Sequence, residues 1–145
     1  MHLNHLPRTV FTLSPDSMFH NALKDFHPIV RRWFEATFGT PSPPQVKGWP
    51  SISSGSNTLI LAPTGSGKTL AAFLWAINHL VEQHFAEELQ PGVRILYVSP
   101  LKALNNDIQR NLEVPLEGIR KEAKEVGLTL PTITTAVRTG DTPQS

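Results

Sequence analysis

Residues 58–77 read TLILAPTGSGKTLAAFLWAI, and this stretch decides the fold. Its first part, TLILA at 58–62, is a short apolar run of the kind that forms a strand buried on both faces of a sheet. After a glycine-containing loop, apolar residues recur at steps of four, three and four, which is typical of an amphipathic helix from Lys68 to His84. These apolar positions are Leu70, Leu74, Ile77 and Val81. A strand, a glycine-rich loop and a helix in this order predict a phosphate-binding loop.

The loop APTGSGKT departs from the general pattern G-x-x-x-x-G-K-[ST] at one position. Gly67, Lys68 and Thr69 match it, whereas Ala62 occupies the position of the first glycine. Gly65 and Gly67 permit backbone conformations and a close approach that a side chain would block. The loop amides and the start of the following helix then point partial positive charge at phosphate oxygens.

The motif also assigns roles to its side chains. Lys68 is expected to contact the β- and γ-phosphates, and the Thr69 hydroxyl to bind magnesium, so both are candidate catalytic residues. The candidate residues of the phosphate site are Pro63, Thr64, Gly65, Ser66, Gly67, Lys68 and Thr69. The alternative, a Gly/Ser-rich turn that happens to precede Lys-Thr, is disfavoured because a strand pattern and a helix pattern flank the loop.

Two further segments have the pattern of buried strands, VRILYVS at 93–99 and TITTAV at 132–137. Helical patterns occupy the intervals between and before them. They cover 19–38 with Pro28 in the first turn, 45–55 with a break at Pro50, the stripe Leu101, Leu104, Ile108 and Leu112, and a separate helix from 115 to 126. Alternating strands and helices predict an α/β fold, a parallel sheet of three visible strands flanked by helices.

Composition narrows the function classes. The 145 residues suit one domain of the usual size, and they carry 13 basic and 12 acidic side chains, so the net charge of +1 gives no argument for nucleic acid. The chain has no cysteine, which excludes disulfide scaffolds, thiolate zinc sites and cysteine nucleophiles. No apolar stretch approaches the ~20 residues of a membrane span, and the N-terminus does not have the pattern of a secretion signal.

Four motifs resemble those of superfamily 2 helicases. The loop that begins with alanine resembles motif I, TPSPPQ at 40–45 the adenine-reading Q motif, SPLKAL at 99–104 motif Ia, and RTGDT at 138–142 the next motif that contacts nucleic acid. The strings TGSGKTLAAFLWAI, SPLKALNNDIQRNL and VRTGDTPQS are similar to the Lhr (large helicase-related) group. The likeness covers residues 26–145 and implies a RecA-like P-loop domain.

The resemblance implies ATP with Mg²⁺ as the bound cofactors. Gln45 would hydrogen-bond the adenine edge, because a carboxamide both donates and accepts. An upstream aromatic, Trp33, Phe34 or Phe38, would stack on the base, and the sequence does not choose among them. Without the resemblance, Gln45 would be interpreted as an exposed polar residue in a proline-rich loop.

Two short segments are candidates for nucleic-acid binding. A helix that begins just after Pro100 offers free N–H groups to a strand phosphate, and Lys102 adds charge there. The alternative is that Leu101 is a core residue and Lys102 a solvated one. Thr139 and Gly140 offer small donors in a turn, although such turns are also common without function. The implied partner is single-stranded or partly duplex DNA, with an RNA/DNA hybrid as an alternative, and no membrane.

The resemblance implies an ATP-dependent DNA helicase in the cytoplasm. No acidic pair follows a predicted strand to hold magnesium and activate water. We therefore interpret 26–145 as the N-terminal part of the ATP-binding domain, ending before the DExx motif, and 1–25 as an irregular extension. We expect the chain alone to hydrolyse little or no ATP, the remainder of the helicase being absent. The alternatives are another P-loop NTPase or a non-functional helicase remnant.

Overall fold

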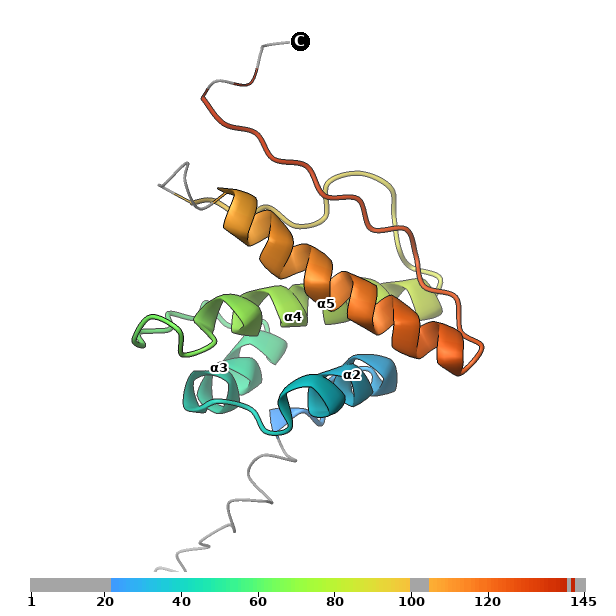
Figure 1. Cartoon of the computed structure of the whole chain (residues 1–145), viewed down its shortest axis with the longest axis horizontal. Helices are drawn as coiled ribbons and strands as arrows, with labels where there is room; N and C mark the ends of the chain where they lie inside the picture. The colour runs from blue at the N-terminus through green and yellow to red at the C-terminus, as the bar shows by residue number, and fades with distance from the viewer. Residues whose placement is uncertain (1–21, 100–104, 141, 143–145) are drawn as a thin grey trace, which may run out of the picture.

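The computed structural model describes residues 22–99, 105–140 and 142 of the chain. Four helices are defined in this part, namely α2 (Pro28–Phe38), α3 (Pro43–Ser53), α4 (Lys68–Phe85) and α5 (Asn105–Glu125). In Figure 1, α4 crosses the middle of the molecule, α2 and α3 lie on one side of it, and α5 crosses it obliquely. The long connections before and after α5 run along the other side of α4. The fold therefore centres on the helix that follows the glycine-rich loop.

Helix α2 begins at the proline that the sequence pattern placed in its first turn. Pro28 suits this position because its missing N–H would have no helical partner there. His27 caps the helix, with its Nδ1 accepting a hydrogen bond from the Ile29 N–H at 3.3 Å. The helix ends at Phe38, and Gly39 follows with a φ of +73°. The end at Phe38 is thus as predicted, whereas α2 begins at Pro28 and not at the start of the predicted range 19–38.

Two prolines lie inside helices that the sequence analysis expected to be interrupted. Pro50 lies within α3, and Pro115 lies within α5, which is one continuous helix rather than two. Each proline removes one backbone hydrogen bond, but buried side chains next to it hold the helix in the core on both sides. The predicted breaks are therefore wrong. Trp49 is 1% exposed and Leu116 is 5% exposed. The predicted start of this helix, after Pro100, lies outside the described residues.

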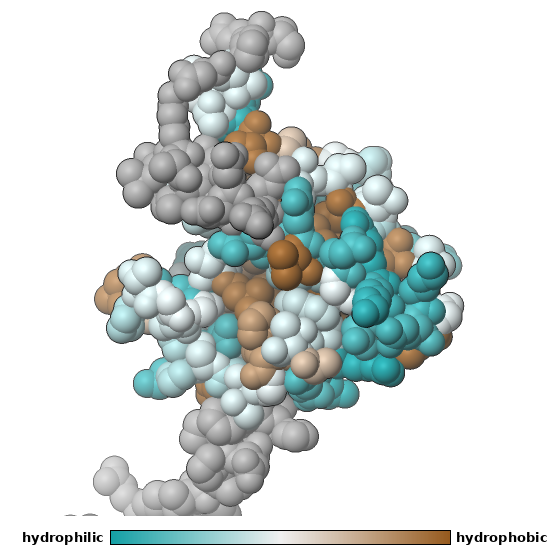
Figure 2. Space-filling model, viewed as in Figure 1, coloured by the Kyte–Doolittle hydropathy of each residue, from teal (hydrophilic) through white to brown (hydrophobic). Residues whose placement is uncertain are grey.

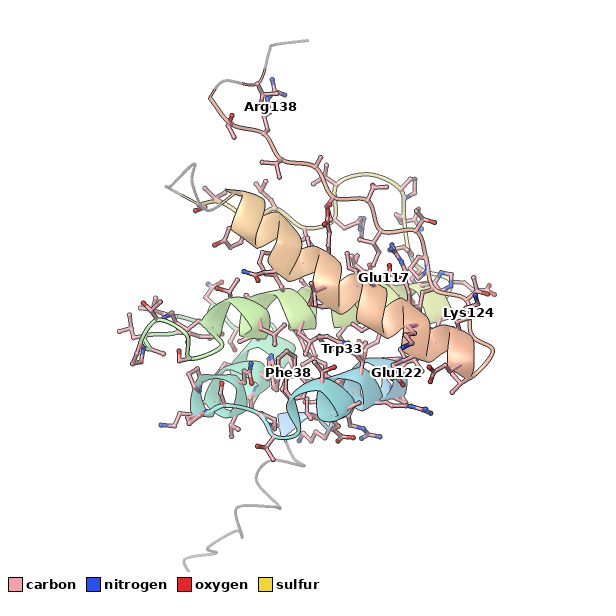
Figure 3. All side chains as sticks on the ribbon, in the orientation of Figure 1. Trp33, Phe38, Glu117, Glu122, Lys124 and Arg138 are labelled. Atoms are coloured by element: carbon pink, nitrogen blue, oxygen red, sulfur yellow. The ribbon has the colours of Figure 1, made fainter. Side chains whose placement is uncertain are left out.

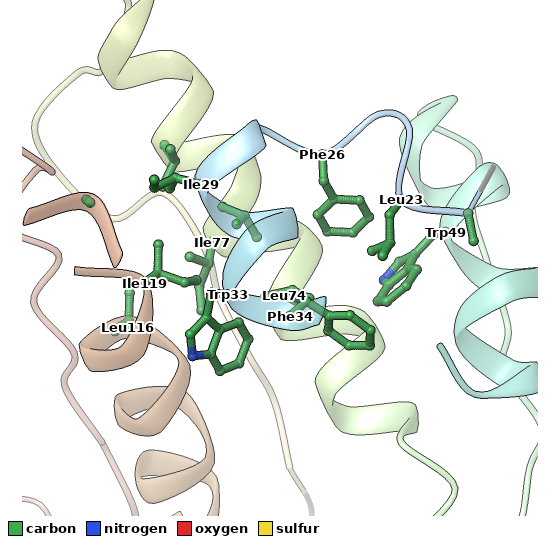
Figure 4. Packing of buried hydrophobic residues seen from close by; sticks show 14 residues of the cluster. Leu23, Phe26, Ile29, Trp33, Phe34, Trp49, Leu74, Ile77, Leu116 and Ile119 are labelled. Carbon is green, nitrogen blue, oxygen red and sulfur yellow. The ribbon is translucent and has the colours of Figure 1, made fainter. Parts of the chain in front are cut away.

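The hydrophobic core is formed by intermixed aromatic and aliphatic side chains (Figure 4). The Trp49 ring meets Phe26 edge-on at 4.8 Å between ring centroids, and Phe34 at 5.4 Å. Aromatic pairs in this geometry add to the stabilisation that comes from burial alone. Helix α4 contributes Leu74, Ile77 and Val81, as its periodicity predicted, with Leu70 partly buried. The other buried members are Ala22, Leu23, Ile29, Val30, Trp33, Leu116, Ile119 and Ala123.

The predicted three-stranded sheet is not formed in the described part of the chain. None of the three segments pairs as a β-strand, although all are extended; they are 58–62, 93–99 and 132–137. Many of their apolar side chains lie in solvent, with Leu61 85% exposed and Val93 87% exposed, whereas Ile60 and Ile133 are half-buried. An apolar strand is stabilised by ladder hydrogen bonds and by cover on both faces, and these segments have neither. Figure 2 shows hydrophobic residues, in brown, reaching the surface among polar ones.

The cap of α2 makes stability depend on pH. His27 Nδ1 accepts a hydrogen bond, and the ring stacks on Phe85 with 4.8 Å between ring centroids. The backbone N–H of His27 donates to Asn78 Oδ1 at 2.7 Å. Burial lowers the pKa of His27 below 6.5, and the Glu82 carboxylate opposes this only in part. The folded state thus favours the neutral ring. The stabilisation that the neutral His27 ring provides is complete above pH 6.5. It is lost as the pH falls from 6.5 through the lowered pKa of His27 in the folded state.

We expect His27→Ser to remove this acid sensitivity. Serine keeps a capping oxygen but does not titrate, so the variant should resemble the parent above pH 6.5 and lose less stability on acidification. The loss of stability on acidification should differ between the two proteins by ~1 kcal/mol, which is the contribution of one helix cap. Thermal denaturation of both proteins across the range below pH 6.5 measures it. An equal acid loss in both proteins would assign the effect to other groups.

Candidate nucleotide and nucleic-acid site

The glycine-rich loop places the start of α4 at the surface. Gly65 has a φ of +79° and Gly67, the N-cap of α4, a φ of +87°. A residue with a side chain would be strained at such left-handed φ angles, whereas glycine is not. The Ser66 N–H donates to the Pro63 carbonyl at 3.3 Å and tightens the loop. The unpaired amides at the start of this 18-residue helix therefore face an open loop, which is the geometry that binds anions.

The ammonium group of Lys68 lies inside this loop. Its Nζ donates to the carbonyl oxygens of Ala62 and Pro63, the latter at 2.8 Å. The lysine thus holds the two residues that open the loop. Because both partners are neutral carbonyls, a phosphate would be a stronger acceptor for the same charge.

The hydroxyl groups of the loop have free hydrogen-bonding capacity. The Ser66 Oγ is buried and has no hydrogen-bond partner among the described residues. Thr69 is exposed at the first turn of α4. A buried hydroxyl without a partner is costly, and a bound phosphate oxygen would satisfy it. The donor set of the loop therefore fits a phosphate group with an oxygen-bound cation at Thr69.

Helix α3 is attached to the loop through its first turn. Ser42 Oγ donates to the Ser66 carbonyl at 2.8 Å, and Gln45 Nε2 reaches the Gly67 carbonyl at 3.4 Å. A β-carbon on Gly67 would lie 2.8 Å from Gln45 Nε2 and 3.0 Å from Ser42 Oγ. Glycine is therefore needed here for space as well as for its φ angle.

Gln45 is a buried residue of this attachment, at 4% exposure. The alternative of an exposed polar residue is therefore wrong. Its Oε1 accepts from the Ser42 N–H at 2.8 Å, which completes a capping box at the start of α3. Ser42 was not singled out by the sequence analysis, although the spacing Ser-x-x-Gln in SPPQ is the signal for such a box.

The three aromatic candidates for adenine stacking differ sharply in exposure. Trp33 is 5% exposed and Phe34 is 1% exposed, because both belong to the core. Phe38 is 51% exposed at the end of α2 that leads to α3 (Figure 3). In the described structure, Phe38 is thus the candidate whose ring a planar base could reach.

Of the candidate nucleic-acid residues, the structure describes only Thr139 and Gly140. Pro100, Leu101 and Lys102 lie outside the described residues. Thr139 and Gly140 form a turn in which the Thr139 N–H donates to Thr142 Oγ1 at 2.9 Å. Figure 1 shows this turn at the far end of the last extended segment, apart from the loop before α4. The structure therefore joins Gln45 to the phosphate loop but does not bring the Thr139 turn to it.

Two kinds of site are not found in the described part of the chain. No three His, Asp or Glu side chains gather there as a metal site. None of the helices that the structure describes is long and apolar enough to cross a membrane.

The loop, its lysine and the helix start define a P-loop nucleotide-binding protein. Comparison with known families gives the particular class: residues 42–141 match the DEAD/DEAH box helicase family, and the chain belongs to that family. This match excludes the alternative of an unrelated P-loop NTPase. It also covers residues 42–45 of the segment that was predicted as the Q motif, and all of the segment 99–104 that was predicted as motif Ia.

Relatives support the predicted Lhr group. The chain is 54% identical over 118 residues to the Lhr helicase/probable uracil glycosylase of Mycolicibacterium smegmatis, covering 81% of this chain and 8% of that protein. It is 56% identical over 113 residues to ATP-dependent helicase Lhr-Core protein 2 of Thermococcus barophilus, covering 78% of this chain and 13% of that protein. The Lhr helicase/uracil glycosylase of Escherichia coli is 43% identical over 122 residues, covering 81% and 8%. The chain thus spans a small part of these relatives.

A solved structure shows the same path of the chain. The Mycobacterium smegmatis helicase Lhr bound to ssDNA and AMP-PNP superposes with a TM-score of 0.76 at 52% identity. The match covers 84% of this chain and 15% of that one. It confirms the predicted RecA-like helicase fold, although the three predicted strands are unpaired in this chain.

Proposed function

We propose that this chain is the ATP-binding and strand-binding part of an ATP-dependent DNA helicase. The observation that carries the proposal is the loop at 62–69, which presents the start of α4 and is attached to Gln45 by hydrogen bonds. The relative that was solved with ssDNA and AMP-PNP supports both ligands at once. In the whole enzyme, hydrolysis at this loop would drive movement along one strand.

The phosphates of ATP would bind at the loop amides between Gly65 and Thr69. Lys68 would exchange its carbonyl partners for the β- and γ-phosphates, and the Ser66 hydroxyl would gain the acceptor that it lacks. Mg²⁺, held by the Thr69 hydroxyl and the phosphates, would neutralise charge on the phosphate chain. Pro63 and Thr64 would complete the wall of the loop.

The adenine would lie between α2 and α3. Gln45 would supply hydrogen bonds to the edge of the adenine. To do so, Gln45 Nε2 would give up its long, 3.4 Å hydrogen bond to the Gly67 carbonyl. Phe38 would supply a ring face, because it alone of the three upstream aromatics is exposed in the described structure. An aromatic ring stacked on a base contributes about 1–3 kcal/mol.

Phe38→Leu is expected to weaken AMP-PNP binding about ten-fold, because leucine keeps apolar bulk but loses the stacking face. Inorganic tripolyphosphate, which lacks the base, should bind both proteins equally. Phe85→Leu is the matched control, since Phe85 is also partly exposed, at 39%, but lies at the other end of α4. Calorimetric titration measures the affinities. Equal AMP-PNP affinity in Phe38→Leu and the parent would remove Phe38 from the adenine site.

The DNA strand would contact Pro100, Leu101 and Lys102 and the turn at Thr139 and Gly140. Amides at a helix start and small turn donors bind backbone phosphates, so the contact would not select sequence. DNA is favoured over an RNA/DNA hybrid by the ssDNA in the solved relative. The same proposal places the enzyme in the cytoplasm.

The three unpaired apolar segments would become neighbouring strands of a parallel sheet in the longer protein. Their exposed residues would then be covered on both faces. The chain supplies no acidic pair after any of these segments, so we expect it to bind nucleotide but to hydrolyse little or none. The boundary at residue 26 stays a prediction, although Leu23 is already buried in the core.

Fluorescence anisotropy with a labelled oligonucleotide tests the function directly. The chain should bind single-stranded DNA, and Mg²⁺ with AMP-PNP should change that affinity. Blunt duplex DNA and an RNA/DNA hybrid of the same length serve as comparison ligands. Binding of neither AMP-PNP nor single-stranded DNA would favour the remaining alternative, a helicase remnant without function.

A further inference from the structure

The connection between α4 and α5 contains an extended segment whose backbone has no partner. This segment, residues 93–98, reads VRILYV, and none of its N–H or carbonyl groups is hydrogen-bonded within the part of the chain that the structure describes. Figure 1 shows the connection, in yellow, on the side of α4 that faces away from α2 and α3. Free N–H and carbonyl groups along an extended segment can pair with a further strand. The segment therefore has an open edge.

The side chains of this segment alternate between two faces, as in a β-strand. Tyr97 is 46% exposed, and its ring lies 5.0 Å, between centroids, from the ring of Phe73, a buried residue of α4. Ile95 is 41% exposed, whereas Leu96 and Val98 are 80% and 78% exposed. The contact with α4 thus orients the segment, with Ile95 and Tyr97 on a half-buried face and Leu96 and Val98 on an exposed one.

We propose that residues 93–98 pair with the same segment of a second copy of this chain, in an antiparallel register centred on Leu96. The inference goes beyond the proposed function and does not involve the nucleotide site. Main-chain hydrogen bonds across the open edge supply the attraction, as they do when an extended peptide adds to a sheet. Six residues a side are fewer than the roughly 20–30 of a standard interface, so we expect a dimer that dissociates on dilution.

The residues of the segment are complementary to their own copy. Natural proteins protect an open edge with prolines or charged side chains, and this segment offers only Arg94. In the register centred on Leu96, Ile95 lies opposite Tyr97 of the second copy, and a β-branched residue opposite an aromatic one is a favourable cross-strand pair. Both residues belong to the half-buried face, so the two copies present matching faces to each other.

The single charge selects this register. Antiparallel pairing about Leu96 separates the two Arg94 side chains by four positions, or about 14 Å along the strands, which exceeds the screening length of ~8 Å at physiological salt. Parallel pairing in register would place them directly opposite each other, where like charges are destabilising. Antiparallel pairing about Ile95 would leave them only two positions apart. The register centred on Leu96 is therefore the one with the least repulsion among these three.

Charges at the centre of the register test the pairing. Leu96→Lys and Leu96→Glu should each weaken the dimer by about five-fold or more, because two like charges then lie opposite each other. An equimolar mixture of the two variants should restore association, because a lysine then lies opposite a glutamate. Sedimentation velocity over a range of concentrations measures the dissociation constant, and a fluorescent label at the N-terminus of one variant detects the mixed dimer.

Leu61→Lys is the matched control. Leu61 is 85% exposed in another extended segment, so the variant gains the same charge at a similar side chain without touching residues 93–98. Its dimer should keep the dissociation constant of the parent. Because Leu96 and Leu61 are both exposed, all three variants should keep the parent's circular dichroism spectrum and melting temperature.

The outcomes separate this inference from the proposed function. A parent chain that sediments as a monomer up to its highest soluble concentration would overturn the pairing. An equal loss in Leu61→Lys would also overturn it, by assigning association to exposed apolar side chains in general. Stronger association of Leu96→Glu alone would place position 96 opposite Arg94 and overturn the register. Dimerisation without AMP-PNP binding would remove the proposed function and leave the pairing intact.

Discussion

Lys68→Ala is expected to weaken AMP-PNP binding by about 30-fold or more. The ammonium group is held inside the loop by the Ala62 and Pro63 carbonyls and is therefore positioned where the phosphates would lie. A hydrogen bond to a charged group contributes about 1.5–3 kcal/mol, and each 1.4 kcal/mol corresponds to about ten-fold in affinity. Tripolyphosphate binding should fall by a similar factor, because the lysine acts on phosphates and not on the base.

Lys47→Ala is the matched control for this experiment. Lys47 is an exposed residue of α3, so the variant loses the same charge without touching the loop. The melting temperature of Lys68→Ala should stay close to that of the parent, since both partners of the lysine are loop carbonyls outside the core. Unchanged AMP-PNP affinity in Lys68→Ala, or an equal loss in Lys47→Ala, would contradict a phosphate site at this loop.

Local patterns were sufficient to predict most of the helices and the phosphate loop. Pro28 and Gly39 mark the ends of α2, and the steps from Leu70 to Val81 identify the buried face of α4. The glycines at 65 and 67 were expected to have unusual backbone angles, and both do. These predictions are correct because each feature is determined by sterics or by periodicity within a few residues.

Features that depend on distant partners could not be predicted in this way. The segment 93–99 has the composition of a buried strand, yet Val93 and Leu96 are exposed, because a strand exists only when neighbours supply hydrogen bonds and cover. Pro115 was expected to begin a helix, but the buried side chains of Leu116 and Ile119 hold α5 across it. In each case, tertiary contacts outweigh the local preference.

The candidate site shows the same division. The proposed role of Lys68 followed from the loop motif and that of Gln45 from the family resemblance, whereas the choice among Trp33, Phe34 and Phe38 required their burial. A helical pattern assigns all three aromatics to one helix and does not say which side is covered by α3 and α5. The attachment of Ser42 to the phosphate loop is likewise a contact across 24 positions that no local pattern contains.

Trp49→Ala is expected to remove about 3–5 kcal/mol of stability, which is a large share of the ~5–15 kcal/mol that holds a typical domain together. The side chain is 1% exposed and lies between the Phe26 and Phe34 rings. Its Nε1–H donates to the Ala71 carbonyl in the first turn of α4 at 2.9 Å. The exposed apolar segments add little burial, so the chain has a small margin to lose.

Trp49→Phe separates the two contributions of this residue. Phenylalanine keeps most of the ring volume and loses the hydrogen bond to Ala71, so its cost should be about 1–2 kcal/mol. Urea denaturation followed by circular dichroism measures both variants. Because Trp49 joins α3 to the helix that begins at the phosphate loop, AMP-PNP affinity should fall in Trp49→Ala even where the chain remains folded, as α3 loses its hold on α4. A Trp49→Ala protein with the parent's denaturation midpoint and AMP-PNP affinity would show that α3 is positioned by its loop contacts alone, through Ser42 and Gln45.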